Sequence, residues 1–224
     1  MPTGMNYARA RDMMVDCQLR TNSVTDLRVL GAMGSIPRER FVPAGRRSLA
    51  YSDEDLRISD GSETPRYLME PVSQGRLIQL ADIGPDELVL VVGCGYGYSC
   101  AIVAQLAGAV VGVEESEEMV SQGSEELLAL DIGNAALVAG PLAKGCPGEG
   151  PYDVILLEGA IEDIPGEIVE QLKDGGRLVT VRGLGRAGSA MSYTKIDGAL
   201  RGTSVFNCAV MPLPGFEKAP AFVF

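Results

Sequence analysis

A loop of alternating glycines is the feature of this sequence with the clearest capacity to bind a ligand. It reads Val92-Gly93-Cys94-Gly95-Tyr96-Gly97-Tyr98. The apolar run LVLVV before it predicts a buried strand, and residues 99–106 after it predict a helix. Glycine adopts positive φ and lets the backbone approach a ligand closely, and a glycine turn between a strand and a helix commonly carries a nucleotide. The alternative is a tight turn without a ligand.

A carboxylate stands where it would complete such a site. Glu114 ends the next apolar run, AVVGV, about 20 residues after Gly93, which is the spacing of acids that accept hydrogen bonds from ribose hydroxyls. In the alternative, Glu114 is a solvated residue beside Glu115 at the start of a helix, where acids complement the helix dipole. The expected ligand contacts are Gly93, Cys94, Gly95, Gly97, Tyr98, Glu114 and Glu115.

The spacing of the glycines favours S-adenosylmethionine over a dinucleotide. Nicotinamide-binding loops follow the pattern GxGxxG, whereas the third glycine here, Gly97, comes one residue earlier. The sequence contains no histidine, so Ser-His and Cys-His nucleophiles, HExxH zinc sites and the commonest general base are excluded. The cysteines show no paired metal spacing, and no metal is expected.

The elements around the loop predict an α/β fold with a doubly wound sheet. From Leu88 onward, apolar runs of strand length alternate with helical stretches, including one over residues 164–173. After Gly188 the segments AMSYTKI, TSVFNCAV and a final AFVF predict antiparallel strands. We therefore expect the Rossmann-like class I S-adenosylmethionine-dependent methyltransferase fold over residues 81–224, with N-terminal helices and a cap over residues 1–80.

The N-terminal third predicts two helices followed by loops. Apolar positions recur at helical spacing from Ala10, and Thr25 with Asp26 predicts the N-cap of a second helix. Residues 37–71 mix Pro, Gly, Ser and charge without a sustained period, which predicts loops with short elements. We expect this cap to cover the carboxyl ends of the strands, where ligands of open α/β sheets bind.

Composition limits the partners and the location. The formal charge of -11 disfavours contact with a phosphate backbone, so no nucleic-acid partner is expected. The apolar runs are far shorter than the roughly 20 residues that cross a bilayer, and the N-terminus lacks an apolar signal core, so we expect no membrane contact and a cytoplasmic location. The five scattered cysteines favour reduced thiols over disulfides.

Longer stretches resemble the protein-L-isoaspartate O-methyltransferase family over nearly the whole sequence. The stretch MVDCQLRTNSVTDLRVLGAMGSIPRERFVPAGRRSLAYSDEDL is similar to the N-terminal helices and RFVP region of that family, VVGCGYGYSCAIVAQL to its glycine motif, and GVE to its ribose-binding acid. The stretch PYDVILLEGAIEDIPGEIVEQLKDGGRLV resembles its fourth and fifth strands with the helix between them. The resemblance implies transfer of a methyl group from S-adenosylmethionine to the α-carboxylate of isoaspartate in a damaged protein or peptide. The alternatives are a class I methyltransferase with a different substrate, and an adenosyl-binding or partner-binding protein without isoaspartate activity.

The sequence departs from the family where the substrate carboxylate would lie. A Gln-Thr-Ile-Ser-x-Pro stretch of the family is replaced by the longer SETPRYLMEP, which places Met69 at the serine position. A thioether cannot donate a hydrogen bond. We therefore expect weak or absent activity on isoaspartyl peptides unless Ser62 or Thr64 supplies the hydroxyl.

Other departures affect the cofactor and the substrate. The segment Ala139-Gly140-Pro141 replaces a Gly-Asp-Gly of the family, which removes an acceptor for the adenine amine, and Val91 replaces an acid that opens the glycine motif. We therefore expect weakened cofactor binding. Arg57 and Arg66 lie in the cap and are able to pair with a substrate carboxylate, but surface salt bridges are the favoured prediction for both.

Overall fold

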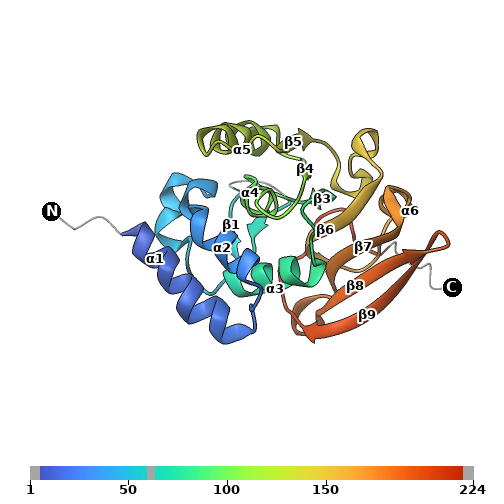
Figure 1. Ribbon diagram of the computed structural model, residues 1–224, viewed down its shortest axis with the longest axis horizontal. Helices are drawn as coiled ribbons and strands as arrows, with labels where there is room; N and C mark the ends of the chain where they lie inside the picture. The colour runs from blue at the N-terminus through green and yellow to red at the C-terminus, as the bar shows by residue number, and fades with distance from the viewer. Residues whose placement is uncertain (1–5, 60–63, 219–224) are drawn as a thin grey trace.

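A seven-stranded sheet lies at the centre of the protein, whose computed structural model describes residues 6–59 and 64–218 (Figure 1). The strand order is β5-β4-β3-β6-β7-β8-β9; the first five strands are parallel, and β8 and β9 pair antiparallel. The strands are β3 (Leu88–Val92), β4 (Ala109–Glu114), β5 (Ala135–Ala139), β6 (Tyr152–Ile161), β7 (Leu172–Arg182), β8 (Ser189–Ile196) and β9 (Ala199–Asn207). This topology confirms the predicted doubly wound sheet with antiparallel C-terminal strands. The predicted final strand AFVF lies outside the described residues.

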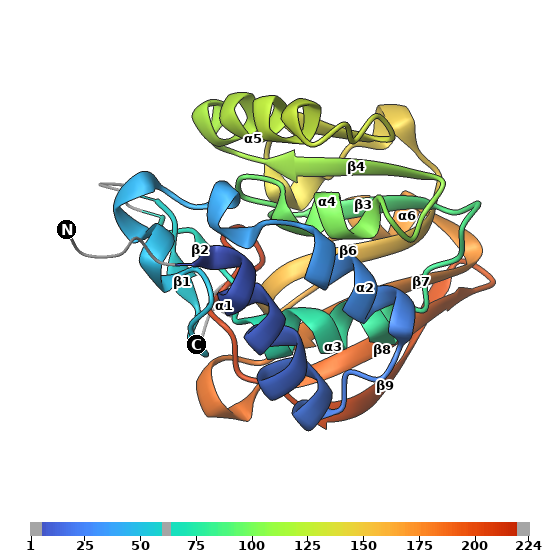
Figure 2. The ribbon, with the colours of Figure 1, turned by 60° about the vertical axis from the view of Figure 1, so that its left-hand side comes forward.

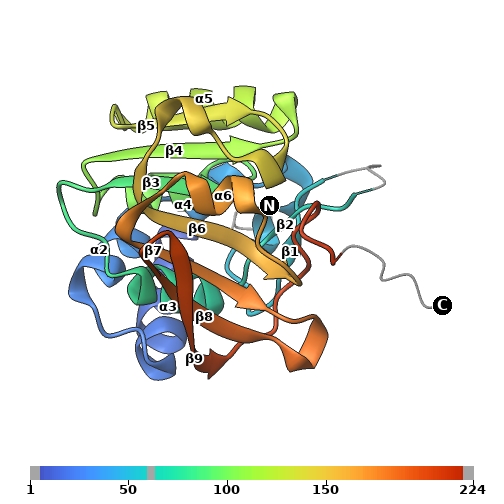
Figure 3. The same ribbon diagram turned by 90° about the vertical axis from the view of Figure 1, so that its right-hand side faces the viewer.

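Hydrophobic side chains cover both faces of the sheet. Along β3, Val89 and Val91 join one hydrophobic cluster, while Leu90 and Val92 join another. The helices are α1 (Tyr7–Met13), α2 (Leu27–Ser35), α3 (Pro71–Ala81), α4 (Tyr98–Val103), α5 (Glu117–Ala129) and α6 (Gly166–Glu170). Figure 3 shows α6 across one face of the sheet, with α2, α3 and α4 on the opposite side. Burial from both sides explains why the strand sequences lack polar alternation.

No helix among the described residues combines the length and the apolar character needed to span a membrane. The first helix continues beyond α1 as a π-helical turn (Met14–Leu19) and a 3₁₀ turn (Arg20–Asn22).

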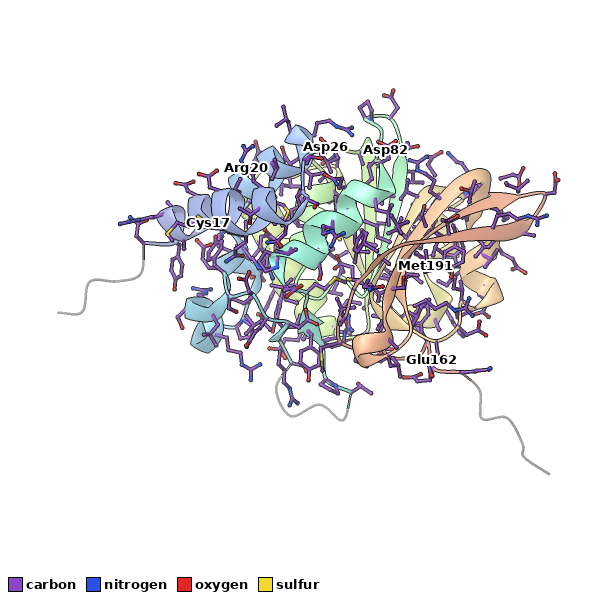
Figure 4. All side chains as sticks on the ribbon, turned by 90° about the horizontal axis from the view of Figure 1, so that it is seen from below. Cys17, Arg20, Asp26, Asp82, Glu162 and Met191 are labelled. Atoms are coloured by element: carbon purple, nitrogen blue, oxygen red, sulfur yellow. The ribbon has the colours of Figure 1, made fainter. Side chains whose placement is uncertain are left out.

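Polar contacts connect the N-terminal helices to α3. Asp26 caps α2 as the sequence predicted, because its side chain accepts a hydrogen bond from the Arg28 backbone N–H at 2.7 Å. In α3, Oε1 of Gln79 accepts hydrogen bonds from the backbone N–H groups of Thr25 and Asp26 at 2.7 and 2.9 Å. The Arg28 guanidinium pairs with both Asp26 and Asp82, which Figure 4 shows near each other. The N-terminal helices are thereby held on the face of the sheet that carries α3.

A cap of short elements lies at the carboxyl ends of the parallel strands. It contains two 3₁₀ helices, Arg38–Phe41 and Ala44–Leu49, and the antiparallel pair β1 (Leu56–Arg57) and β2 (Tyr67–Leu68). In Figure 2 the arrowhead of β4 points toward these elements. The prediction of loops with short elements over residues 37–71 is therefore confirmed for the part that the structure describes.

Two helices are shorter than the sequence predicted. The helix expected over residues 164–173 is limited to α6, because β7 already begins at Leu172, which pairs with Tyr152. The helix expected over residues 99–106 ends at Val103. In both cases the pattern of apolar residues continues beyond the point where the backbone leaves the helix, so periodicity alone overestimates the length.

A buried arginine connects the cap to α3. Arg38 is 1% exposed. Its Nε donates a hydrogen bond to the Ala50 carbonyl at 2.6 Å, its Nη1 donates to the Gln74 side chain at 2.8 Å, and its Nη2 donates to the Met69 carbonyl. The guanidinium also lies 4.8 Å from the centre of the Tyr98 ring. One side chain thus holds several segments of the cap against α3 and α4.

Replacing this arginine should destabilise the fold. Arg38→Met keeps a long side chain but removes its hydrogen bonds, and we expect the free energy of unfolding to fall by roughly 3 kcal/mol because buried acceptors lose their donors. Urea denaturation followed by circular dichroism measures the change. The control is Arg47→Met at an exposed position, which should change stability by less than about 0.5 kcal/mol. Equal losses in the two variants would contradict the assignment.

Candidate functional site

The glycine loop follows the carboxyl end of β3, between the neighbouring strands β4 and β6. Gly93, Gly95 and Gly97 have φ values of +82°, +55° and +88°. A Cβ on Gly93 would lie 2.7 Å from Nη2 of Arg66, and a Cβ on Gly95 would lie 2.5 Å from Cδ1 of Ile58. Glycine is therefore required both by the backbone conformation and by the close packing of the cap.

Glu114 lies at the end of β4, fully buried beside the glycine loop. Its Oε2 accepts a hydrogen bond from the Gly95 N–H, and its Oε1 accepts one from the Glu115 N–H, each at 2.9 Å. The structure thus brings together the acid and the loop that the sequence spacing paired.

Arg66 occupies the space that faces Glu114. Its Nε lies 3.2 Å from both carboxylate oxygens of Glu114, and its Nη2 lies 3.1 Å from Oε2. The same Nη2 donates a hydrogen bond to the Gly93 carbonyl at 2.8 Å. The result is a bidentate ion pair beside the glycine loop.

The structure contradicts the surface salt bridge predicted for Arg66. The one predicted for Arg57 stays a prediction. Arg66 is 5% exposed, so the predicted surface salt bridge is wrong for this residue. Its backbone N–H donates a hydrogen bond to Oγ of Ser59 at 2.8 Å, which holds Arg66 beside this buried serine. Arg57 does lie at the surface, where its Nε donates to the Ser59 carbonyl at 3.0 Å.

A cavity of about 520 Å³ opens beside the ion pair, within the range of roughly 300 to 1,000 Å³ that is usual for ligand sites. Its lining residues are Pro43, Ala44, Ile58, Ser59, Thr64, Arg66, Tyr96, Glu114, Glu115, Ser116, Glu118, Met119 and Gln122. Thr64, one of the two candidate hydroxyls, is among them, whereas Ser62 lies outside the described residues. Of the predicted ligand contacts, Glu114 and Glu115 are among these lining residues, whereas Gly93, Cys94, Gly95, Gly97 and Tyr98 are not. The volume and the buried acid fit an adenosyl ligand.

Three other residues that the sequence predicted as ligand contacts pack against the protein interior. Cys94 is buried, and a Cβ on Gly97 would lie 2.9 Å from Cδ1 of Leu137. Tyr98 is fully buried and packs against Phe41 with 5.7 Å between ring centres. The structure therefore places Tyr98 in the core, and the tyrosine that lines the cavity is Tyr96, two residues earlier.

Glu158, which does not line this cavity, is an acid in β6 that the sequence analysis missed. It lies in the second half of β6, where Ser99 Oγ donates a hydrogen bond to its Oε2 at 2.6 Å and Gln74 Nε2 donates to its Oε1 at 3.2 Å. Burial raises the pKa of Glu158 above its ordinary value, while these hydrogen bonds lower it. The signal in the sequence was an acid directly after the apolar residues of YDVILLE, near the carboxyl end of a parallel strand.

Three features define the class I methyltransferase fold. They are a parallel sheet with antiparallel C-terminal strands, a glycine loop after β3 and a buried acid at the end of β4. The chain belongs to the protein-L-isoaspartate(D-aspartate) O-methyltransferase family, whose sequence model matches residues 9–218. It is therefore a methyltransferase that uses S-adenosylmethionine. The resemblance, the fold class and the cofactor predicted from the sequence are confirmed.

Individual relatives support the same assignment. A protein-L-isoaspartate O-methyltransferase of Koribacter versatilis is 35% identical over 213 residues, which are 95% of this chain and 93% of the relative. Protein-L-isoaspartate O-methyltransferase 2 of Anaeromyxobacter sp. is 42% identical over 173 residues, which are 77% of this chain and 70% of the relative.

Solved structures agree on the fold. One named protein-L-isoaspartate O-methyltransferase superposes with a TM-score of 0.79 at 26% identity, covering 92% of this chain and 66% of the other. A putative protein-L-isoaspartate O-methyltransferase from Plasmodium falciparum, in complex with S-adenosyl-L-homocysteine, superposes with a TM-score of 0.70 at 18% identity over 93% of this chain and 98% of the other. At that identity the second comparison shows the fold alone.

The glycine loop should not tolerate a side chain. In Gly95→Ala the new methyl group needs a left-handed backbone and meets Ile58, so we expect the free energy of unfolding to fall by about 1 to 2 kcal/mol. The control is Gly133→Ala, where a Cβ meets no atom within 4 Å. Thermal and urea unfolding compare the two, and a loss at Gly133 as large as that at Gly95 would argue against the constraint.

Proposed function

We propose that this enzyme transfers the methyl group of S-adenosylmethionine to the carboxylate of isoaspartyl residues in damaged proteins. The observation that carries the proposal is the buried Glu114 carboxylate, hydrogen-bonded to Gly95 at the edge of a cavity of suitable volume. The substrate class is that named for the family and for its relatives.

In this proposal the chain contributes binding and orientation. The backbone of Gly93, Cys94 and Gly95 approaches the adenosyl ligand, Glu114 accepts hydrogen bonds from its ribose, and Glu115 lies beside it. The bound cofactor supplies an activated methyl group on a sulfonium. Because a carboxylate acceptor is already ionised, positioning dominates the rate, and the absence of histidine from the sequence is no obstacle.

The proposal extends to organisation and location. Residues 81–224 would form the S-adenosylmethionine-binding methyltransferase domain, and residues 1–80 would form the N-terminal helices and the cap. The five cysteines Cys17, Cys94, Cys100, Cys146 and Cys208 are all free thiols, which supports a reducing, cytoplasmic compartment.

Glu158 favours a second candidate, a hydroxyl or amine acceptor. Such an acceptor must lose a proton, and a partly buried carboxylate with a raised pKa is suited to accept one. The two candidates differ in their products. A carboxyl methyl ester releases methanol in base, whereas a methyl amine or methyl ether does not, so treating the radiolabelled product with base distinguishes them.

Removing the ribose-binding acid should weaken cofactor binding. In Glu114→Ala we expect the affinity for S-adenosyl-L-homocysteine to fall by about 1.5 to 3 kcal/mol, the usual worth of hydrogen bonds to a charged group. Isothermal titration calorimetry measures the change. Glu118→Ala is the matched control, since Glu118 is an exposed carboxylate that lines the same cavity. An unchanged affinity in Glu114→Ala would place the ribose elsewhere.

Restoring a hydroxyl at position 69 should raise turnover. We expect slow methyl ester formation on an isoaspartyl peptide by the parent chain, because Met69 cannot donate a hydrogen bond to the acceptor, and a misplacement of about 1 Å costs about a hundredfold. Met69→Ser should increase kcat, whereas Met69→Ala, which removes the same bulk without adding a hydroxyl, should not. An aspartyl peptide is the substrate control. Rapid turnover by the parent would instead direct attention to Thr64, which lines the cavity.

A further inference from the structure

The cavity proposed for the adenosyl ligand opens to solvent between the cap and α5. Some of the residues that line it are buried, and others are exposed and mark its mouth. The exposed ones are Ala44 and Thr64 on the side of the cap, and Glu115, Glu118 and Gln122 at and just before the first turns of α5. A ligand that enters from solvent therefore passes between these two sides.

An ion pair joins the same two sides next to the mouth. Nε of Arg40, in the first 3₁₀ helix of the cap, lies 2.5 Å from Oε2 of Glu126 in α5. Arg40 lies three residues before Pro43, which lines the cavity. Glu126 lies about one helical turn after Gln122, which lines the opposite side. The pair thus connects the two sides beside the path of the ligand.

The ion pair is placed where it is able to break and re-form without unfolding of the cap. The side chains of Arg40 and Glu126 are 35% and 26% exposed, so water and salt weaken their attraction. Arg38, two residues earlier, is buried and donates a hydrogen bond to Gln74 in α3. The inner side of the cap therefore stays anchored when the outer pair breaks.

We propose that Arg40 and Glu126 are positioning residues that set the width of this mouth. Breaking their ion pair lets the adenosyl cofactor enter and its demethylated product leave. This inference rests on the proposed function, because it takes the cavity beside Glu114 to be the adenosyl site. The pair itself touches the walls of the path rather than the bound ligand, so it acts on the rates of exchange.

The first test measures both rates of exchange for S-adenosyl-L-homocysteine by surface plasmon resonance. In Arg40→Glu two carboxylates face each other, and we expect the association and dissociation rate constants to rise together by about threefold to fivefold, the effect of losing a partly exposed pair. The dissociation constant should change little, because a wider mouth speeds passage in both directions. A rise in the dissociation rate constant alone would overturn the proposal, as would unchanged rates.

The second test exchanges the two charges. Arg40→Glu combined with Glu126→Arg restores an attractive pair, so both rate constants should return toward those of the parent. Damage to the local structure would not be repaired in this way, because the coupling between two residues is what such a double variant isolates. Rates that stay as high as in Arg40→Glu would overturn the proposal.

The parent chain provides a test that needs no variant. Salt screens the attraction between Arg40 and Glu126, so both rate constants of the parent should rise as sodium chloride is added. In Arg40→Glu salt screens a repulsion instead, and the rate constants should fall. Rates in the parent that do not depend on salt would contradict the role of the pair.

The matched control is Lys173→Glu. Lys173 and Asp153 form an ion pair of 2.7 Å that is also partly exposed, and neither residue lines the cavity. We expect Lys173→Glu to lose about as much stability to urea as Arg40→Glu while keeping the exchange rates of the parent. An equal rise of the rates in both variants would assign the effect to general destabilisation and overturn the inference.

The outcomes separate this inference from the proposed function. Methyl ester formation on an isoaspartyl peptide, with exchange rates that do not respond to Arg40, would overturn the inference and leave the proposed function standing. No binding of S-adenosyl-L-homocysteine by the parent would overturn both.

Discussion

The buried ion pair between Glu114 and Arg66 is the contact on which the arrangement of the site depends. Glu114 belongs to the sheet and Arg66 to the cap, and each of these buried charges is paired with the other, because an unpaired buried charge is disfavoured. The pair also holds the loop in place, because Arg66 bonds the Gly93 carbonyl and Glu114 bonds the Gly95 N–H. The shape of the cofactor cavity is therefore set by electrostatics as much as by packing.

A second polar series links the cap to the strand on the other side of the loop. Arg38 bonds Gln74, Gln74 bonds Glu158, and Ser99 at the start of α4 bonds the same carboxylate. The two series end on β4 and β6, the neighbours of β3 on either side. The cap thus contributes charged and polar groups at the carboxyl ends of β4 and β6. A displacement of the cap would change the surroundings of both Glu114 and Glu158.

The parts of the site that could be predicted from the sequence are those that lie close together along the chain. The loop and Glu114 belong to one strand-turn-helix-strand unit, so their spacing alone brings them together. Arg66 reaches Glu114 across 48 residues, from a segment without periodicity, and no local pattern indicates such a contact. The burial of Tyr98, which the sequence predicted as a ligand contact, was missed for a related reason: the first turn of α4 directs Tyr98 into the core, and this direction depends on how the helix packs.

The cap and its neighbours α2 and α3 precede in the sequence nearly everything that they cover. Gln74 is separated from Glu158 by 84 residues, and the buried side chains of Leu30 and Met33 pack in a cluster that includes residues of β6 and β7. A ribosome therefore releases the cap long before its supporting surface exists, and the emerging N-terminal third exposes apolar side chains to chaperones and to other nascent chains. The cavity proposed for the adenosyl ligand is lined by residues as late in the sequence as Gln122, so it can form only after β4 and the first half of α5 have been synthesised.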